Sequence, residues 1–161
     1  MGQVTRLLSP PERLVIDAFR RLAPFRESYD LGDLACAAIE LNTRLGPKAE
    51  AVLAQMLVVD REFAAFWPAQ TWRAPGYPAA TLGERLLLNL VFCAQSSQFR
   101  LEWLAMRFGR GRSPPGLLSN LRRLAALLLM AEVVLPDPAR PAAPAAPPRR
   151  ARPVLAAVKA G

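Results

Sequence analysis

The chain has 161 residues, 52% of them hydrophobic and 21% charged, which is enough for one core of ordinary size. It contains no histidine and only two, widely separated cysteines, so the usual zinc ligand sets and a histidine general base are excluded. The formal net charge is +8, and residues 1–97 are balanced at ten Lys/Arg against ten Asp/Glu, so the excess lies in the C-terminal part. This asymmetry favours a polyanionic partner.

Leucine and alanine dominate the composition, and both lose little side-chain entropy in a helix. We therefore expect an all-α fold in which residues 1–135 form one compact bundle of about six helices. Three of these helices lie between residues 10 and 67. The first starts at Ser9-Pro10-Pro11-Glu12 and the second at Asp30, because serine and aspartate are favoured N-cap residues.

A loop rich in proline and glycine follows Pro68 and separates the two halves of the domain. We expect Trp72 and Tyr77 to pack this loop against the helices.

The second half, residues 81–131, is predicted to hold three more helices. Thr81-Leu82-Gly83-Glu84 has the pattern of a capping box and opens the fourth helix, and Gln95-Ser96-Ser97 marks a polar turn after it. The fifth helix is predicted over about 98–108, and the sixth from Pro114-Pro115 to about Ala131.

Residues 136–161 are rich in proline, alanine and arginine and cannot bury enough apolar surface to offset chain entropy. They are predicted to form a disordered basic tail. The N-terminus lacks the apolar core of a signal peptide, and the longest apolar run, 124–135, is too short to span a membrane. We therefore expect a cytoplasmic protein without a membrane span.

Cys36 and Cys93 each lie within an apolar helical pattern, which predicts two buried free thiols. Aromatic residues among basic ones can stack on nucleic-acid bases. For Trp67, Trp72 and Trp103, however, packing in the core is the expected role.

Residues 101–124 carry the pattern with most functional content. Two helices with apolar residues three and four apart are joined by a basic turn; these apolar residues are Leu101, Leu104 and Phe108 in the first and Leu117, Leu121 and Leu124 in the second. Together with the preceding helix, residues 81–131, this pattern resembles the helix-turn-helix of bacterial winged-helix regulators. In that family a small residue is followed four positions later by a turn glycine, as Ala105 and Gly109 are here.

The resemblance implies a small DNA-binding protein, such as a transcriptional regulator, that presents its second helix to the major groove of double-stranded DNA. Seven residues are the predicted contacts: Arg107, Arg110, Arg112, Ser119, Asn120, Arg122 and Arg123. Arginine can bond guanine bidentately, serine can bond a base or a phosphate, and asparagine can bond adenine. The arginines of the first helix and the turn would contact phosphates.

Three features depart from the family pattern. The connection between the helices is about two residues longer than usual, Pro114 and Pro115 stand where polar capping residues are common, and no convincing β-hairpin wing follows the last helix. The helices within 10–67 either form a homodimer interface or complete a single core. The basic tail is either a solvated extension or a non-specific electrostatic arm.

Neighbouring amphipathic helices of any bundle show the same spacing, so a non-enzymatic helical adaptor or assembly subunit is the alternative. It would bind a partner protein through the leucines of the sixth helix, namely Leu117, Leu118, Leu121, Leu124 and Leu128. A third hypothesis is association of the basic tail with an anionic membrane surface. No enzyme is predicted, because carboxylate pairs such as Asp60 and Glu62 lack completing groups; no cofactor, metal or small-molecule ligand is evident.

Overall fold

The computed structural model describes residues 6–68, 70–111 and 115–140. Along these residues lie α1 (Pro10–Ser28), α2 (Leu31–Leu45), the short 3-10 helix η1 (Gly46–Lys48), α3 (Ala49–Phe66), α4 (Leu82–Ser96), α5 (Gln98–Phe108) and α6 (Pro115–Met130). The only β feature among them is an isolated bridge between Leu7 and Ala79. The predicted all-α class is therefore confirmed, and the predicted helices agree with these bounds to within a few residues.

The helices begin at the predicted capping patterns, although at α1 only the Glu12 half of the box forms and the Ser9 hydroxyl has no partner among the described residues. The Ser9 backbone N–H donates to the Glu12 carboxylate at 2.8 Å, and the Asp30 carboxylate accepts from the Gly32 N–H at 2.8 Å. At α4, the Thr81 hydroxyl accepts from the Glu84 N–H at 3.2 Å, while the Glu84 carboxylate accepts from the Thr81 N–H at 2.8 Å. Each cap satisfies a backbone N–H that the helix itself leaves without a partner.

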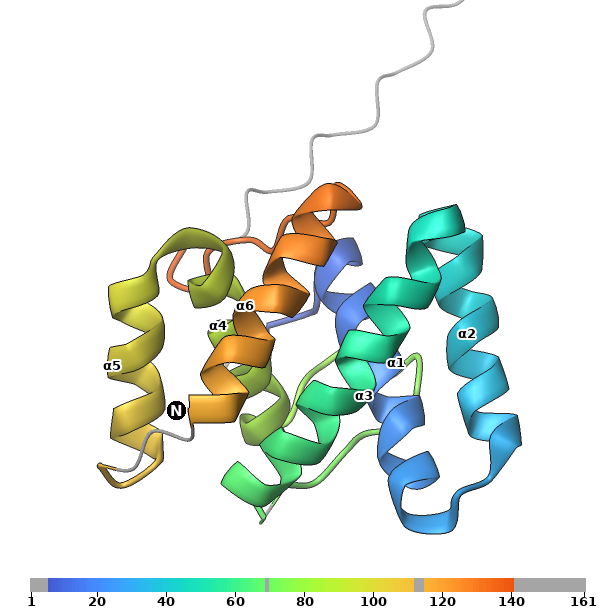
Figure 1. Ribbon diagram of the computed structural model, residues 1–161, viewed down its shortest axis with the longest axis horizontal. Helices are drawn as coiled ribbons and strands as arrows, with labels where there is room; N and C mark the ends of the chain where they lie inside the picture. The colour runs from blue at the N-terminus through green and yellow to red at the C-terminus, as the bar shows by residue number, and fades with distance from the viewer. Residues whose placement is uncertain (1–5, 69, 112–114, 141–161) are drawn as a thin grey trace, which may run out of the picture.

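All six α-helices contribute to one hydrophobic core. Helix α6 lies at its centre, packed mainly against α3 and α4, whereas α2 and α5 lie at opposite edges of the bundle (Figure 1). The edge position of α2 explains why only Ala37 and Leu41 of that helix are buried. It also corrects one prediction, because Cys36 is exposed on α2 while Cys93 of α4 is buried as expected.

The loop between α3 and α4 is held against α1. The Trp72 ring stacks on Phe19, with the ring centroids 6.3 Å apart, which confirms the packing predicted for this tryptophan. The Tyr77 ring instead stays 45% exposed, and it is the backbone carbonyl of Tyr77 that contacts α1.

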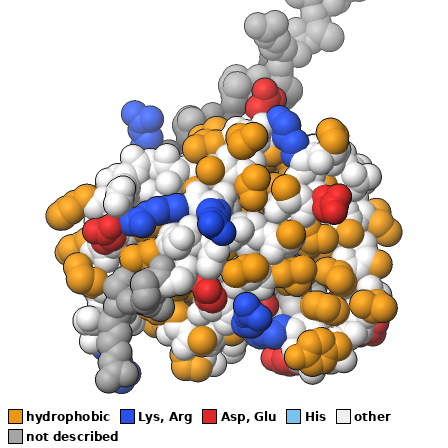
Figure 2. Space-filling view, in the orientation of Figure 1, with side chains coloured by type: hydrophobic (Ala, Val, Ile, Leu, Met, Phe, Trp, Pro, Cys, Tyr) orange, Lys and Arg blue, Asp and Glu red, His pale blue; other side chains and the backbone are white. Residues whose placement is uncertain are grey.

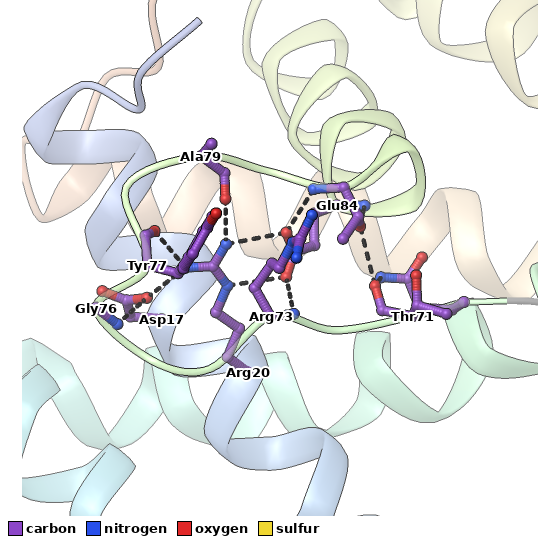
Figure 3. Close-up of polar contacts among 10 residues, drawn as sticks. Asp17, Arg20, Thr71, Arg73, Gly76, Tyr77, Ala79 and Glu84 are labelled. Atoms are coloured by element: carbon purple, nitrogen blue, oxygen red, sulfur yellow. Dashed lines mark hydrogen bonds and ion pairs between the residues drawn. The ribbon is translucent and has the colours of Figure 1, made fainter. Parts of the chain in front are cut away.

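That carbonyl belongs to a buried polar network centred on Arg20, which is 1% exposed (Figure 3). The guanidinium of Arg20 donates to both carboxylate oxygens of Glu84 at 2.8 and 3.0 Å, and to Asp17 at 3.0 Å. It also donates to the carbonyls of Tyr77 at 2.7 Å and Ala79 at 2.8 Å. All five N–H groups of the side chain are thus satisfied, and α1, the loop and α4 are connected through one residue.

Glu84 is the anionic partner at the centre of this network and is fully buried. Besides Arg20, its carboxylate accepts from the backbone N–H groups of Arg73 at 2.9 Å and Thr81 at 2.8 Å. Burial by itself would raise the pKa of Glu84, but these hydrogen bonds and the Arg20 charge hold the pKa below its ordinary value. The network is therefore fully paired at neutral pH.

The pKa of Asp60, on α3, is shifted in the opposite direction. Burial raises its pKa above the ordinary value, and the hydrogen bond and charge of Arg26, 2.6 Å away, offset this only in part. Glu84 therefore contributes stability that is lost as the pH falls through its lowered pKa. Asp60 favours the folded state below its ordinary pKa and loses that contribution as the pH rises through its raised pKa.

We expect Asp60→Asn to make the protein more acid-sensitive, because the substitution removes the group that favours folding in acid while Glu84 remains. Urea unfolding at pH values between about 7 and about 3 should show a steeper fall of the unfolding free energy in the variant than in the wild type. An equal or shallower fall would show that Asp60 does not oppose Glu84.

The described chain continues beyond the predicted domain boundary at Leu135. The Gln95 side chain donates to the carbonyl of Val133 at 2.9 Å and accepts from the N–H of Leu135 at 3.0 Å. Asp137 then accepts from the N–H of Ala139 at 2.9 Å and stabilises a turn. The Arg6 guanidinium donates to the Pro138 carbonyl at 3.1 Å, which joins the two ends of the described part. Residues 141–161 of the predicted disordered tail lie outside the described residues.

Candidate nucleic-acid interface

The sixth helix turns its apolar stripe into the core. Leu117, Leu121, Leu124 and Leu128 are each 0% exposed, which confirms their predicted inward orientation. Their partners are mainly α3 and α4; α5 contacts α6 only lightly. In this fold α6 is therefore supported by the bundle as a whole rather than by the helix that precedes it.

The five leucines of α6 that the adaptor hypothesis assigned to partner binding are buried as well. All five, including Leu118 at 8% exposure, belong to the core. They cannot form a docking surface while the bundle stays folded. Protein binding by this chain therefore requires a different surface.

The outer face of α6 carries two of the predicted DNA contacts in an accessible position. Ser119 and Arg123 are exposed and lie four residues apart, one helical turn, on the side away from the leucine stripe. Arg122 is half-buried, and its guanidinium donates to Glu102 of α5 at 2.8 Å. Arg122 therefore connects α6 to α5, and its Nε is buried without a partner among the described residues.

Asn120 faces α3 instead of solvent. Its amide nitrogen donates to Glu62 at 3.1 Å and to the Gly116 carbonyl at 3.0 Å, while its oxygen accepts from Gln55 at 3.0 Å. The Asn120 side chain thus makes its hydrogen bonds within the protein. These bonds position α6 against α3. To bond a base, Asn120 would first have to exchange these contacts.

The ends of α6 are complemented by charges from the start and end of α3. The Lys48 ammonium donates to the carbonyl of Met130 at the C-terminus of α6. Glu62 lies beside Gly116 at the N-terminus. This arrangement matches the helix dipole and fixes an antiparallel α3–α6 pair. Because a carboxylate is already next to the N-terminus of α6, phosphate contacts there depend on arginine side chains.

Two predicted phosphate contacts on α5 and the following turn are exposed. The Arg107 guanidinium lies over the Trp103 ring, 5.2 Å from its centroid, in a cation–π contact. Arg110 follows in the left-handed backbone region, at φ 53°, and is exposed in the turn after α5. Arg112 lies outside the described residues.

The candidate interface is thus an array of separate cations. Figure 2 looks onto the face of α6 and shows Lys and Arg side chains separated by neutral and apolar surface, with carboxylates among them. A short array of this kind can contact phosphates at a few points. Among the described residues no group of three Asp, Glu or Cys side chains is arranged to hold a metal ion, and no helix has the length and hydropathy required to cross a membrane.

Sequence reasoning missed one surface feature. Trp103, expected in the core, is 49% exposed on α5, and Phe99 and Met106 beside it are 78% and 47% exposed. The signal was present in the sequence, because these residues recur at i, i+4 and i+7 on the face opposite Leu101 and Ala105.

No protein-family model, curated protein or solved structure matches the chain.

Proposed function

We propose that this chain is a small DNA-binding protein that contacts double-stranded DNA through the outer face of α6 and the basic residues of α5 and the turn. The observation that carries the proposal is the exposure of Ser119 and Arg123 on one face of α6; Arg107 on α5 and Arg110 in the turn after it are exposed as well. Exposure of Ser119 and Arg123 on the outer face of the second helix is what base contact by a helix-turn-helix needs, and it supports a role in transcription regulation.

The roles follow from accessibility. Arg123 is the residue best placed to reach a base edge, where it would bond guanine bidentately, and Ser119 would bond a neighbouring base or phosphate. Arg107, Arg110 and Arg112 would contact phosphates, which sets the position of the protein on the duplex. Arg122 would join them only after it leaves Glu102, and Asn120 would keep α6 in place.

Removing Arg107 and Arg123 together should weaken DNA binding strongly. We expect Arg107→Ala/Arg123→Ala to lower the affinity for a fluorescent 24-bp duplex by about tenfold or more, as lost base and phosphate contacts do. The slope of log K against log salt should shrink by roughly 0.9 for each phosphate contact removed. Fluorescence anisotropy at several salt concentrations measures both quantities.

The matched control is Arg13→Ala/Arg44→Ala, which removes two exposed charges from α1 and α2. If this control weakens binding as much, attraction depends on net charge and not on the α6 face. A third variant replaces Arg149, Arg150 and Arg152 by alanine in the full chain. If only this variant loses affinity, binding is a non-specific property of the C-terminal segment, and absence of binding by the wild type would refute the proposal.

A further inference from the structure

The outward face of α5 is an apolar stripe bordered by arginines. Phe99, Trp103 and Met106 form the stripe, and Arg100 and Arg107 are exposed along one of its sides. Arg100 and Arg107 are seven residues apart, so their Cα atoms are separated by about 10 Å along the helix axis. On the other side Glu102 is paired with Arg122 at 2.8 Å, so the charges left beside the stripe are the two arginines and, where the stripe meets the turn at 137–139, the single carboxylate of Asp137.

A pocket opens beside this stripe, between α4, α5 and the turn at 137–139. It has a volume of about 320 Å³. Its walls are mainly apolar side chains, with Phe92 and Cys93 from α4, and Phe99, Trp103 and Leu104 from α5. Arg100 and Asp137 also line it. Aromatic side chains and arginine lining a pocket, with an exposed methionine on the same helix face, are the composition typical of protein-binding hot spots.

We propose that α5 and this pocket bind an amphipathic helical segment of a partner protein. Its apolar side chains would fill the pocket and cover Trp103 and Met106, and its carboxylates would pair with Arg100 and Arg107. This assignment goes beyond DNA binding and replaces the buried leucines of α6 as the protein-binding surface.

Two observations select this occupant. The stripe extends beyond the pocket to Met106, which does not line it, so an extended ligand covers the exposed apolar surface better than a small molecule does. The flanking cations disfavour a second copy of the chain, because a symmetric contact across α5 would bring Arg100 and Arg107 of both copies together. An acidic partner has the complementary charge.

The test is a selection from a displayed library of random 16-residue peptides against the full chain, with Phe99→Ser/Trp103→Ser as the counter-selection target. Enriched peptides should carry apolar residues at helical spacing and a net negative charge. The best peptide, made synthetically, should lose at least about tenfold in affinity with Trp103→Ser, as expected of an aromatic hot spot. Ile39→Ser, at an apolar position on α2 that is more exposed than Trp103, should leave its affinity unchanged within about twofold.

A charge exchange makes the test specific. Arg100→Glu should weaken the acidic peptide, and replacing a carboxylate of the peptide by lysine should restore binding to this variant. No enrichment, enrichment of neutral or basic peptides, or equal affinity for the Trp103→Ser variant would overturn the proposal. So would self-association of the wild type, seen in sedimentation equilibrium, that Trp103→Ser abolishes, or Trp103-dependent binding to vesicles of anionic phospholipid.

DNA binding and peptide binding can fail independently. Arg107 belongs to both proposals and lies over the Trp103 ring, but Phe99 belongs only to the second. A Phe99→Ser variant should therefore keep its affinity for duplex DNA while it loses affinity for the peptide.

Discussion

Replacing Arg20 by methionine is expected to lower the free energy of unfolding by about 3–5 kcal/mol. The substitution leaves the Glu84 carboxylate buried without its cation, and it removes the donor that holds the Tyr77 and Ala79 carbonyls. Small domains are stable by only about 5–15 kcal/mol, so the loss is a large fraction of the total. Urea unfolding followed by circular dichroism at pH 7 measures it.

The neighbouring Arg21 supplies a matched control. Arg21 pairs with Glu40 at 3.0 Å, but both side chains are about one-third exposed. Arg21→Met should therefore cost less than about 1 kcal/mol. Equal losses in the two variants would mean that the buried network does not set the stability of this region. Adding Asp17→Asn and Glu84→Gln to Arg20→Met should recover part of the loss, because no buried charge then lacks a partner.

Replacing Leu121 by alanine is expected to destabilise the fold by about 2–5 kcal/mol. Leu121 is 0% exposed on the central helix, between α3 and α4, and truncation leaves a cavity that these helices can close only in part. The control on the same helix is Leu129→Ala, because Leu129 is 42% exposed and its removal creates no cavity. Chemical unfolding should give free energies of unfolding that differ by at least about 1 kcal/mol between the two variants. Equal free energies would contradict the central position of α6.

Local rules of sequence were sufficient to predict the helices. Ser9, Asp30 and Thr81 each combine a cap residue with a following apolar helical pattern, and a helix begins after all three; the Asp30 and Thr81 side chains cap their helices, whereas at Ser9 the bond is made by the Glu12 carboxylate. The inward stripe of α6 was equally predictable, because Leu121 and Leu124 recur at helical spacing.

Properties that depend on tertiary position were not predictable in the same way. Cys36 and Cys93 have similar local patterns, but only Cys93 lies on a helix that the core surrounds. Arg20 and Glu84 are 64 residues apart, and an Asp17–Arg20 pair at i, i+3 is as typical of an exposed helix face as of a buried network. Nothing in the local sequence distinguishes these cases.

The candidate site shows the same division. The helical pattern predicts that Ser119 and Arg123 point away from the leucine stripe, and both are exposed. The pattern does not reveal that Asn120 is taken up by Gln55 and Glu62, because α3 is the distant segment that packs beside it. The large apolar side chain of Trp103 favours the core by residue type alone. Its position on α5, on the face opposite Leu101 and Ala105, indicates the exposed side instead.

The contact between Arg6 and the Pro138 carbonyl gives the described part of the chain a nearly circular path, because its first residue meets one close to its end. In such an arrangement the core depends on which helix faces are complementary. The order of the helices along the sequence matters less. A chain covering residues 6–138 could therefore be circularly permuted, with a short peptide joining these two residues and new termini between α5 and α6, without separating any pair of helices that pack together.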